Sequence, residues 1–375
     1  MKRVLIAGAG PVGLTAAYAL TRAGIAVTVF ERGAELAEDL RASTWHPPTL
    51  DMMEELGLID EILAQGLKAR HTQHRDRKTG VIAEFDMELL RGETNHPYRI
   101  QYEQFKFTQL VQARLKGEVR FGAGVVSVAQ DDSSVKVILE DGSEHSGDYL
   151  IGADGASSAV RRAIGIEFEG MTFPERFFVV STPFDFSAVL ERLCFVNYIA
   201  DTDEFCVLLK VPGLWRCLFP TQDESDAQVL ASGPQKLQGV FARSEPYETV
   251  HKTLYNVHQR VATKYRVGRA FLAGDAAHIN NPLGGMGMNG GLHDVLNLCD
   301  KLIKGGNLDL YESERRPIAI EYINANTARN RKLMSERDPA ARRRAQDEIC
   351  RIAENPVTAK QFLMKSSMIE TLRRP

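Results

Sequence analysis

The sequence has few cysteines and no long apolar run, and these absences exclude several classes of protein. The 5 cysteines among 375 residues are widely spaced and form no Cys-x-x-Cys pair, which argues against a disulfide framework and against a zinc site. No uninterrupted stretch of about 18 apolar residues is present. The apolar run Val4 to Ala9 is too short and too rich in glycine for a signal peptide. We therefore expect a cytoplasmic protein with no membrane segment and no bound metal.

The chain also lacks an excess of charge of either sign. The 46 Lys and Arg against 49 Asp and Glu give a net charge of −3, and the two signs alternate along most of the length. This balance argues against nucleic acid or an anionic membrane as the main partner and favours a small molecule. The basic cluster Arg342 to Arg344 lies among acidic residues, as is typical of a solvated helix face.

The first motif that points to a function lies at the start of the chain. The apolar run Arg3 to Ala7 predicts a strand buried on both faces, and the pattern from Pro11 to Ala23 predicts a helix. Between them stand Gly8, Gly10 and Gly13, with the G-x-G-x-x-G spacing. Glycines at these positions permit a tight turn, close approach of the backbone to a pyrophosphate, and close packing of the helix on the strand.

Three later features extend this prediction. A second strand, Ile25 to Phe30, ends on Glu31, about 20 residues after the middle glycine, where a carboxylate would accept hydrogen bonds from ribose hydroxyls and repel a 2′-phosphate. The segments Gly152 to Arg161 and Gly268 to Asn289 supply two more turns of the nucleotide-binding type, and the second of these segments leads into a helix. The first motif with Glu31 indicates FAD or NAD rather than NADP, and two helix starts able to bind anions favour the extended FAD.

With these three motifs in this order, residues 1 to 330 at least resemble the single-component aromatic hydroxylases, the flavoprotein monooxygenases typified by p-hydroxybenzoate hydroxylase. The resemblance implies an oxidoreductase of aromatic catabolism that uses NAD(P)H and O2 to hydroxylate a phenolic or N-heteroaromatic small molecule through a flavin C4a-hydroperoxide. FAD would be bound tightly but without a covalent bond, and NADH or NADPH would visit as a transient co-substrate. The implied fold is α/β: a Rossmann-like FAD-binding domain, an inserted substrate domain built on a mixed or antiparallel sheet, and C-terminal helices.

The resemblance also implies a set of residues that bind FAD. Asp275 would hold the ribityl chain, and the helix that begins near Gly287 would direct its amides at the flavin ring. Most of the other positions belong to the three motifs. Arg32 follows Glu31, and Arg41, Gln104 and Val126 lie between the first and the second motif. The full set is Gly8, Gly10, Gly13, Glu31, Arg32, Arg41, Gln104, Val126, Asp154, Gly274, Asp275, Pro282, Gly285, Gly287, Met288 and Asn289.

By family position, the substrate pocket would lie between the flavin and the second sheet, with Pro282 lining the ring. Arg216, on an apolar strand, would either clamp a substrate carboxylate or extend into solvent from an edge strand. His46 would either accept a phenolic proton or make a structural hydrogen bond. Tyr198 would be a hydrogen-bonding group of the pocket or part of the core. The strand near Cys206 is expected to contribute to the same pocket.

The pattern along the chain predicts how these parts are divided. We expect a helix over Glu35 to Gly66, a strand over Val119 to Val128, a mostly antiparallel sheet from Phe177 to Pro220, and helices from Gly291 onward, broken at three prolines. The expected FAD-binding domain is discontinuous and consists of residues 1–69, 100–170 and 250–330. The expected substrate domain consists of residues 70–99 and 171–249, and the C-terminal helical segment of residues 331–375.

Two other functions remain compatible with the sequence. An FAD-linked oxidoreductase without oxygen insertion would keep the same frame. A redox-silent binding protein would keep the nucleotide fold as a scaffold, but the intact segment Gly274 to Asn289 counts against it, because a scaffold does not require contacts to a flavin ring. The sequence is compatible with a monomer and with a homodimer.

Overall fold

The computed structural model describes residues 2–38, 40–221 and 225–373. Within these residues the strands form four sheets. The first has the order β18 (Arg266–Val267), β19 (Ala270–Leu272), β12 (Tyr149–Gly152), β1 (Arg3–Ala7), β2 (Ala26–Phe30) and β8 (Glu118–Arg120). The second has the order β20 (His278–Ile279), β17 (His251–Ala262), β13 (Phe168–Thr182), β16 (Leu214–Thr221), β15 (Cys206–Val211), β14 (Val196–Ala200), β5 (His71–Asp76) and β6 (Gly80–Asp86).

Two small sheets and a set of helices complete the architecture. The small sheets are β11 (Glu144–Gly147), β10 (Val135–Leu139) and β9 (Val125–Gln130), and β3 (Thr44–Trp45), β7 (Arg99–Gln101) and β4 (Leu67–Ala69). The α-helices are α1 (Pro11–Arg22), α2 (Pro47–Glu55), α3 (Ile59–Gln65), α4 (Gln104–Arg114), α5 (Ala159–Ala163), α6 (Asp226–Ala231), α7 (Gly233–Val240), α8 (Gly287–Lys304), α9 (Leu310–Pro317), α10 (Asn324–Ser335), α11 (Pro339–Glu354) and α12 (Pro356–Ser366). None of the described helices is both long and apolar enough to cross a membrane.

The first sheet confirms the predicted Rossmann-like core. β1 pairs in parallel with β2 and with β12, and β12 pairs in parallel with β19. Val4, Leu5 and Ile6 have no exposed surface, because helices and the neighbouring small sheet cover both faces of β1. This double burial explains why β1 is apolar throughout, whereas a strand with one solvated face would alternate.

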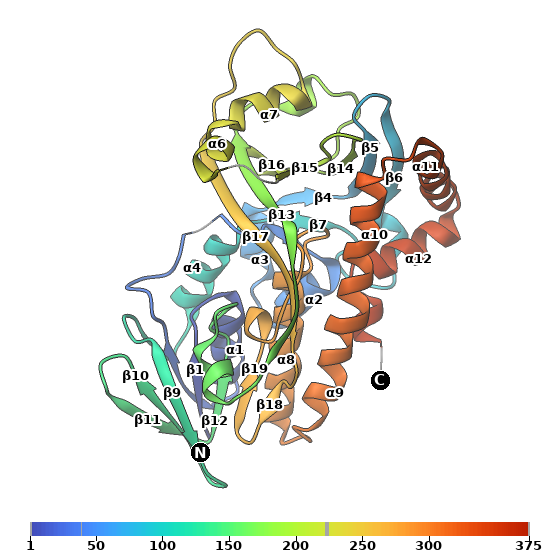
Figure 1. Ribbon diagram of the computed structural model, residues 1–375. Helices are drawn as coiled ribbons and strands as arrows, with labels where there is room; N and C mark the ends of the chain where they lie inside the picture. The colour runs from blue at the N-terminus through green and yellow to red at the C-terminus, as the bar shows by residue number, and fades with distance from the viewer. Residues whose placement is uncertain (1, 39, 222–224, 374–375) are drawn as a thin grey trace.

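The second sheet confirms the predicted, mostly antiparallel layer, although β14 and β5 pair in parallel. Its longest strands, β13 and β17, run from beside the first sheet to α6 and join the two layers (Figure 1). The sequence analysis did not predict β17, because polar and apolar residues follow no regular alternation along it. Successive side chains of this sheet point to opposite faces and pack in two cores. Cys206 and Phe178 belong to the outer core, on the side of α7, and Val207 and Phe177 belong to the inner core, on the side of Leu283. Cys206 itself therefore points away from the inner core, whereas Val207 and Leu209 of the same strand line the cavity described below, and a role of this strand in substrate binding stays a prediction.

Two predicted elements are wrong. The helix expected over Glu35 to Gly66 begins only at Pro47 and is divided into α2 and α3, because Pro47 and Pro48 favour a helix start and Gly57 ends the first segment at a φ of 69°. The strand expected over Val119 to Val128 is two strands in different sheets, β8 and β9. The chain turns between them at Gly122, which has a φ of 62°.

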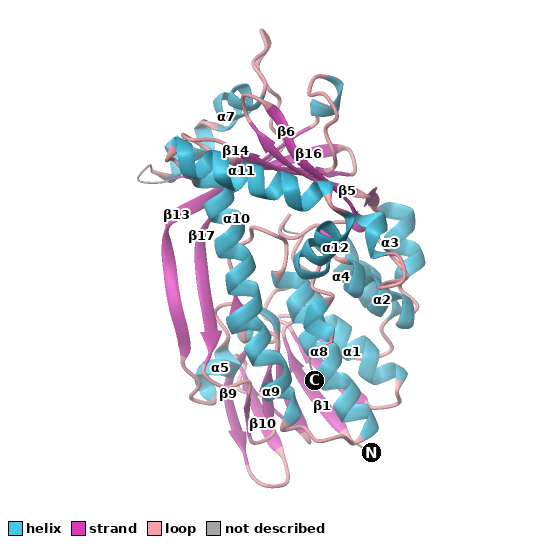
Figure 2. Ribbon diagram, turned by 90° about the vertical axis from the view of Figure 1, so that its right-hand side faces the viewer, coloured by secondary structure: helices cyan, strands magenta, loops and turns pink. Residues whose placement is uncertain are grey.

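The C-terminal helices follow the predicted prolines in two of three places. Pro339 and Pro356 stand at the first positions of α11 and α12, where a missing amide hydrogen costs no helical bond. Pro317 ends α9, but the chain continues as a π-helix over Ile318–Ile323 and then as α10, so no break in helical structure follows it. Figure 2 shows α9 and α10 in line beside β13 and β17, with α11 crossing near the second sheet.

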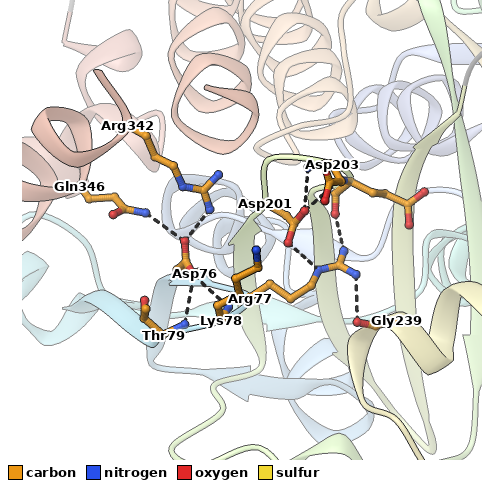
Figure 3. Close-up of polar contacts among 10 residues, drawn as sticks. Asp76, Arg77, Lys78, Thr79, Asp201, Asp203, Gly239, Arg342 and Gln346 are labelled. Atoms are coloured by element: carbon orange, nitrogen blue, oxygen red, sulfur yellow. Dashed lines mark hydrogen bonds and ion pairs between the residues drawn. The ribbon is translucent and has the colours of Figure 1, made fainter. Parts of the chain in front are cut away.

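One carboxylate attaches α11 to the second sheet. Asp76, at the end of β5, accepts hydrogen bonds from Arg342 and Gln346 of α11 and from the amides of Lys78 and Thr79 (Figure 3). Burial alone would raise the pKa of Asp76, but these donors outweigh it and lower the pKa from 3.8 to about 2. The ionised form is therefore the one that holds the helix.

We expect Asp76→Asn to reduce the free energy of unfolding by about 2 kcal/mol at pH 7, because a folded-state pKa near 2 corresponds to that much differential stabilisation. The contribution is complete above the unfolded pKa of about 3.8 and is lost as the pH falls toward 2. Asp347→Asn, at an exposed carboxylate of the same helix, is the matched control. Thermal unfolding and hydrogen exchange of α11 measure both variants. Equal stability and equal protection of α11 in both would contradict this attachment.

Candidate active site

The glycines of the first motif have the three different environments that a nucleotide turn requires. A Cβ at Gly8, whose φ is 99°, would lie 2.4 Å from the carbonyl oxygen of Ala153, and a Cβ at Gly13 would lie 2.0 Å from the carbonyl oxygen of Gly8. At Gly10, by contrast, a Cβ would meet nothing within 4 Å. Gly8 and Gly13 therefore permit close packing of α1 on the first sheet, and Gly10 leaves open space at the N-terminus of α1, where the helix favours an anion.

Glu31 is held in place beside this turn. Its carboxylate accepts hydrogen bonds from the amides of Ala9, at 2.7 Å, and Gly33, at 2.8 Å. The two bonds fix the carboxylate at the end of β2 and leave further lone pairs for ribose hydroxyls. Its neighbour Arg32 is exposed and pairs with Glu140 at 3.1 Å.

The second and third motifs place two more carboxylates near the ends of adjacent strands. Asp154, after β12, accepts hydrogen bonds from the amides of Ala159 and Val160 with one oxygen, while its buried Oδ1 has no hydrogen-bond partner. Asp275, which follows β19, has a solvent-accessible side chain. Protein atoms nevertheless surround its carboxylate closely, as at the bottom of a recess. These surroundings raise the pKa of Asp275, although the charges of His278 and Arg41 oppose the rise.

These groups fit an extended dinucleotide. β1, β12 and β19 are neighbouring parallel strands, and ligands of such sheets bind outside the carboxyl ends of the strands. Along this edge lie the open space at Gly10, the unpartnered oxygen of Asp154 and the accessible carboxylate of Asp275. The donors and acceptors suit a pyrophosphate, a ribose and a polyhydroxyl chain, and FAD contains all three.

Two further positions implied by the resemblance lie at the margin of the first sheet. Gln104 is the first residue of α4 and donates its amide to the carbonyl of Ala42 at 2.9 Å. Val126, on β9, is 50 % exposed, which is unusual for a large apolar side chain. Contacts from these residues to FAD remain a prediction.

A loop rich in glycine connects the FAD recess, the edge of the first sheet from Gly10 past Asp154 to Asp275, with the second sheet. This flavin loop consists of residues 282–286 and leads into α8, whose first residue is Gly287. Gly284 and Gly285 have φ values of 115° and 67°, which other residues adopt only with strain, and a Cβ at Gly285 would lie 3.2 Å from the Cβ of Thr44. Met288, the second residue of α8, packs into the main core.

Asn289 holds this loop against the segment that contains β3. Its amide group donates to the carbonyls of Thr44 and Gly285, and its oxygen accepts from the amide of His46 and the hydroxyl of Thr49. The side chain is fully buried, and these four hydrogen bonds occupy it. Asn289 therefore fixes the shape of the loop, for which the sequence gives no direct signal, and a role toward the flavin through this loop stays a prediction.

A small cavity lies between this loop and the inner face of the second sheet. It is lined by Thr44, Val196, Tyr198, Val207, Leu209, Leu218, Pro282, Leu283, Gly284 and Gly285. Its volume of about 40 Å³ is below the roughly 150 Å³ of a cavity that accommodates benzene, so apolar side chains must move when a ring enters. Pro282 and Tyr198, both predicted at the pocket, lie on its wall.

His46 and Arg216 are both buried near this cavity. The Nε2 of His46 bonds the carbonyl of Gly284 at 2.9 Å, so that nitrogen carries the proton and Nδ1 the lone pair. Burial, together with the charge of Arg99, lowers the pKa of His46 well below its ordinary value, so the ring is neutral near pH 7. Arg216 is 3 % exposed on the central strand β16 and donates to the carbonyl of Leu40. The alternative of an edge-strand arginine in solvent is therefore wrong.

The sequence analysis did not identify two buried polar residues of β7 that lie near the cavity. Arg99 and Gln101 on β7 are buried, and the hydroxyl of Thr44 donates to Gln101 at 3.1 Å. Both residues lie in a segment whose pattern is irregular, and β7 is only three residues long.

Tyr198, on the cavity wall, stacks on the buried imidazole of His74, with 5.2 Å between the ring centroids.

Comparisons with known proteins agree with this geometry. A family model described as an FAD binding domain matches residues 1–326. The chain is 32% identical to para-nitrophenol 4-monooxygenase of a Pseudomonas species, over 96% of this chain and 94% of that protein. It is 33% identical to 6-hydroxy-3-succinoylpyridine 3-monooxygenase of Pseudomonas putida, over 90% of each chain. The crystal structure of p-nitrophenol 4-monooxygenase from Pseudomonas putida superimposes with a TM-score of 0.93 at 30% identity and full coverage of both chains.

The environments of Gly10 and Gly13 lead to a first prediction for this site. Gly10→Ala should change the stability of the FAD-free protein by less than about 1 kcal/mol, because its Cβ meets open space, but should weaken FAD binding at least about tenfold. Gly13→Ala should also lower the free energy of unfolding, by about 2 kcal/mol or more, because its Cβ cannot fit against Gly8. Thermal unfolding and FAD titration separate the two effects. Wild-type affinity in Gly10→Ala would show that the pyrophosphate lies elsewhere.

The recess at Asp275 leads to a second. Asp275→Ala should lose bound FAD during gel filtration, because it removes an acceptor for the ribityl hydroxyls. Asp300→Ala, at an exposed carboxylate on α8 that pairs with Lys304, should retain it. The ratio of flavin to protein absorbance gives the retained fraction. Equal retention by the two variants would mean that the motif is placed wrongly.

Proposed function

The chain belongs to the FAD-binding-domain family of flavin-dependent aromatic monooxygenases, and we propose that it hydroxylates a phenolic or N-heteroaromatic ring held in the cavity beneath the second sheet. The protein is an FAD-dependent oxidoreductase. One observation supports the location of the reaction: the loop of residues 282–285 forms a wall of the cavity and continues into α8 beside the FAD recess. A ring in this cavity would therefore meet the flavin edge across that loop.

Bound FAD supplies the transfer of electrons from a reduced pyridine nucleotide and the activation of O2. The chain supplies the position and the surroundings. Glu31 and Asp275 would hold the ribose and ribityl hydroxyls, and the N-terminus of α1 at Gly10 would hold the pyrophosphate. The amides at the start of α8 would face the flavin edge that becomes negative on reduction.

The cavity wall would orient the ring and exclude water. Seven of its residues, Val196, Tyr198, Val207, Leu209, Leu218, Pro282 and Leu283, carry apolar or aromatic side chains. A dry wall keeps water from the activated oxygen and strengthens every polar contact to the substrate. Tyr198 would pack against the ring, since its own ring stacks on His74 and is largely buried.

We assign His46 a positioning role. Its lowered pKa weighs against a base that keeps a phenolic proton at neutral pH. Its backbone amide bonds Asn289 and its ring bonds Gly284, so His46 connects the segment after β3 to the loop that would face the flavin. Arg216 lies on the same sheet face as Leu218 and would be the cation nearest to a substrate group at the Leu40 side of the cavity.

The pyridine nucleotide would visit only transiently. The glycines of the first motif and Glu31 would be committed to FAD, so the nicotinamide must approach the flavin across the surface near Arg41 and Asp154. Arg41 is exposed there, as an approach to a charged visitor requires.

This proposal predicts that an aromatic substrate controls the reduction of the enzyme. Flavin reduction by NADH or NADPH, followed by stopped flow, should be slow alone and should accelerate at least about tenfold with a phenol that is hydroxylated. 4-Nitrophenol and hydroxypyridines are the first compounds to compare, because the relatives named above act on such rings. An analogue without the activating hydroxyl should yield hydrogen peroxide instead of a hydroxylated product.

Two outcomes would contradict the proposal. Rapid reduction without any aromatic compound, with NADP⁺ that stays bound through turnover, would place the protein among monooxygenases of a different mechanism. Reduction by NAD(P)H with no oxygen uptake under any aromatic compound would indicate an FAD-linked reductase.

A further inference from the structure

A buried arginine beside the cavity has no compensating charge. Arg99 is 3 % exposed and donates from Nη2 to the carbonyl of Ser366, at the end of α12. Its Nε and Nη1 are buried and have no hydrogen-bond partner, and no carboxylate of the described residues forms an ion pair with it. A guanidinium removed from water without an anion is strongly unfavourable, so the arrangement requires a group that supplies the missing charge.

A second donor points to the same place. Gln101 lies two residues from Arg99 on β7, so both side chains project from one face of the strand, while Ile100 between them packs in the main core. Gln101 is fully buried, and its Nε2 has no partner. The oxygen of Gln101 accepts a hydrogen bond from the hydroxyl of Thr44, which fixes the amide group and leaves Nε2 as an unpartnered donor.

One hydrogen bond and two electrostatic influences place this pair of donors at the cavity. Thr44, which lines the cavity, bonds Gln101. Tyr198, on the opposite wall, stacks on His74, and burial together with the charges of Arg329 and Arg99 lowers the pKa of His74 to about 3. His46 bonds the lining residue Gly284 and is also under the influence of Arg99.

The neighbouring groups cannot neutralise this charge. The imidazoles of His46 and His74 are both buried and neutral, and Arg329 adds a further positive charge near His74. The rest of the cavity wall is apolar apart from Thr44 and Tyr198. The end of the cavity at Thr44 is therefore positive and rich in donors, whereas Arg216 lies on the other side, behind the lining residue Leu218.

We propose that Arg99, assisted by Gln101, binds the oxygen of a phenolic substrate in its ionised form and so selects phenols that can bind as phenolates. The proposal rests on the function proposed above. On binding, the O–H bond of the phenol breaks, its proton passes to solvent, and the electron pair stays on the oxygen beside the guanidinium. The ionised oxygen makes the ring richer in electrons, which favours attack on an electrophilic oxygen atom.

The ionisation of bound 4-nitrophenol tests this assignment directly, because its phenolate and its neutral form absorb at different wavelengths. The FAD-loaded protein, without pyridine nucleotide, is titrated with 4-nitrophenol over a range of pH, and the flavin spectrum is subtracted. In the wild type, the bound phenol should ionise about one pH unit or more below the free phenol. One unit corresponds to a tenfold preference for the phenolate.

Arg99→Met should abolish this shift and weaken the binding of the phenolate at least about tenfold. Arg99→Lys keeps the charge and should retain part of the shift. Arg75→Met is the matched control, because Arg75 is a buried arginine of β5 whose donors are satisfied by Gln73 and the carbonyl of Glu191. It should leave the ionisation of the bound phenol unchanged. If Arg99 only caps α12, Arg99→Met would alter stability but not the ionisation of the ligand.

The outcomes separate the two proposals. An unshifted phenol in the wild type, or a full shift in Arg99→Met, would overturn the role of Arg99 even if the protein hydroxylates phenols. Benzoate that displaces the phenolate and depends on Arg99 more strongly than the phenolate does would assign the site to carboxylates instead and would also overturn it. Failure of every phenol and hydroxypyridine to perturb the bound flavin would contradict the proposed function itself.

Discussion

The hydrogen bonds of the Asn289 side chain are the constraint on which the site depends. Through one buried amide, the start of α8 is tied to the loop at Gly285, to the carbonyl of Thr44, and to the residues that begin α2. All of these partners except Gly285 lie more than 200 residues before Asn289 in the sequence. Because a buried amide must satisfy both its donors and its acceptor, a shift of any partner leaves a polar group unpaired. The FAD recess and the cavity under the second sheet are therefore held in one relative position.

The C-terminal segment strengthens this arrangement from the other side. Met368 is fully buried against Met286 of the flavin loop and Ile318, although its φ of 65° is strained for a residue with a side chain. The carbonyl of Ser366, two residues earlier, accepts a hydrogen bond from Arg99. The last helices thus complete the wall behind the loop, and the attachment of α11 through Asp76 fixes them to the second sheet.

The sequence predicts the FAD half of the molecule far better than the substrate half. Motif spacing is a local property, so it is sufficient to assign separate roles to Gly8, Gly10 and Gly13, and the packing around them has the expected form. The cavity depends instead on side chains brought together from β3, β14, β15, β16 and the flavin loop, and no local pattern marks that meeting. Arg216 illustrates the limit, since its strand was predicted but its central place in the sheet follows only from the pairing with β13 and β15. Arg99 lies in a segment of irregular pattern, which gives no signal of its place beside the cavity.

We infer that FAD occupies the recess from Gly10 to Asp275 and presents its ring to the cavity under the second sheet. A crystal structure of the protein with FAD and a non-reactive phenol analogue tests this claim most directly. We expect the pyrophosphate at the N-terminus of α1, the flavin ring against residues 282–289, and the analogue beside Tyr198 and Leu218 with its polar group toward β7. A flavin ring turned away from this loop, or an analogue bound outside the cavity, would contradict the claim.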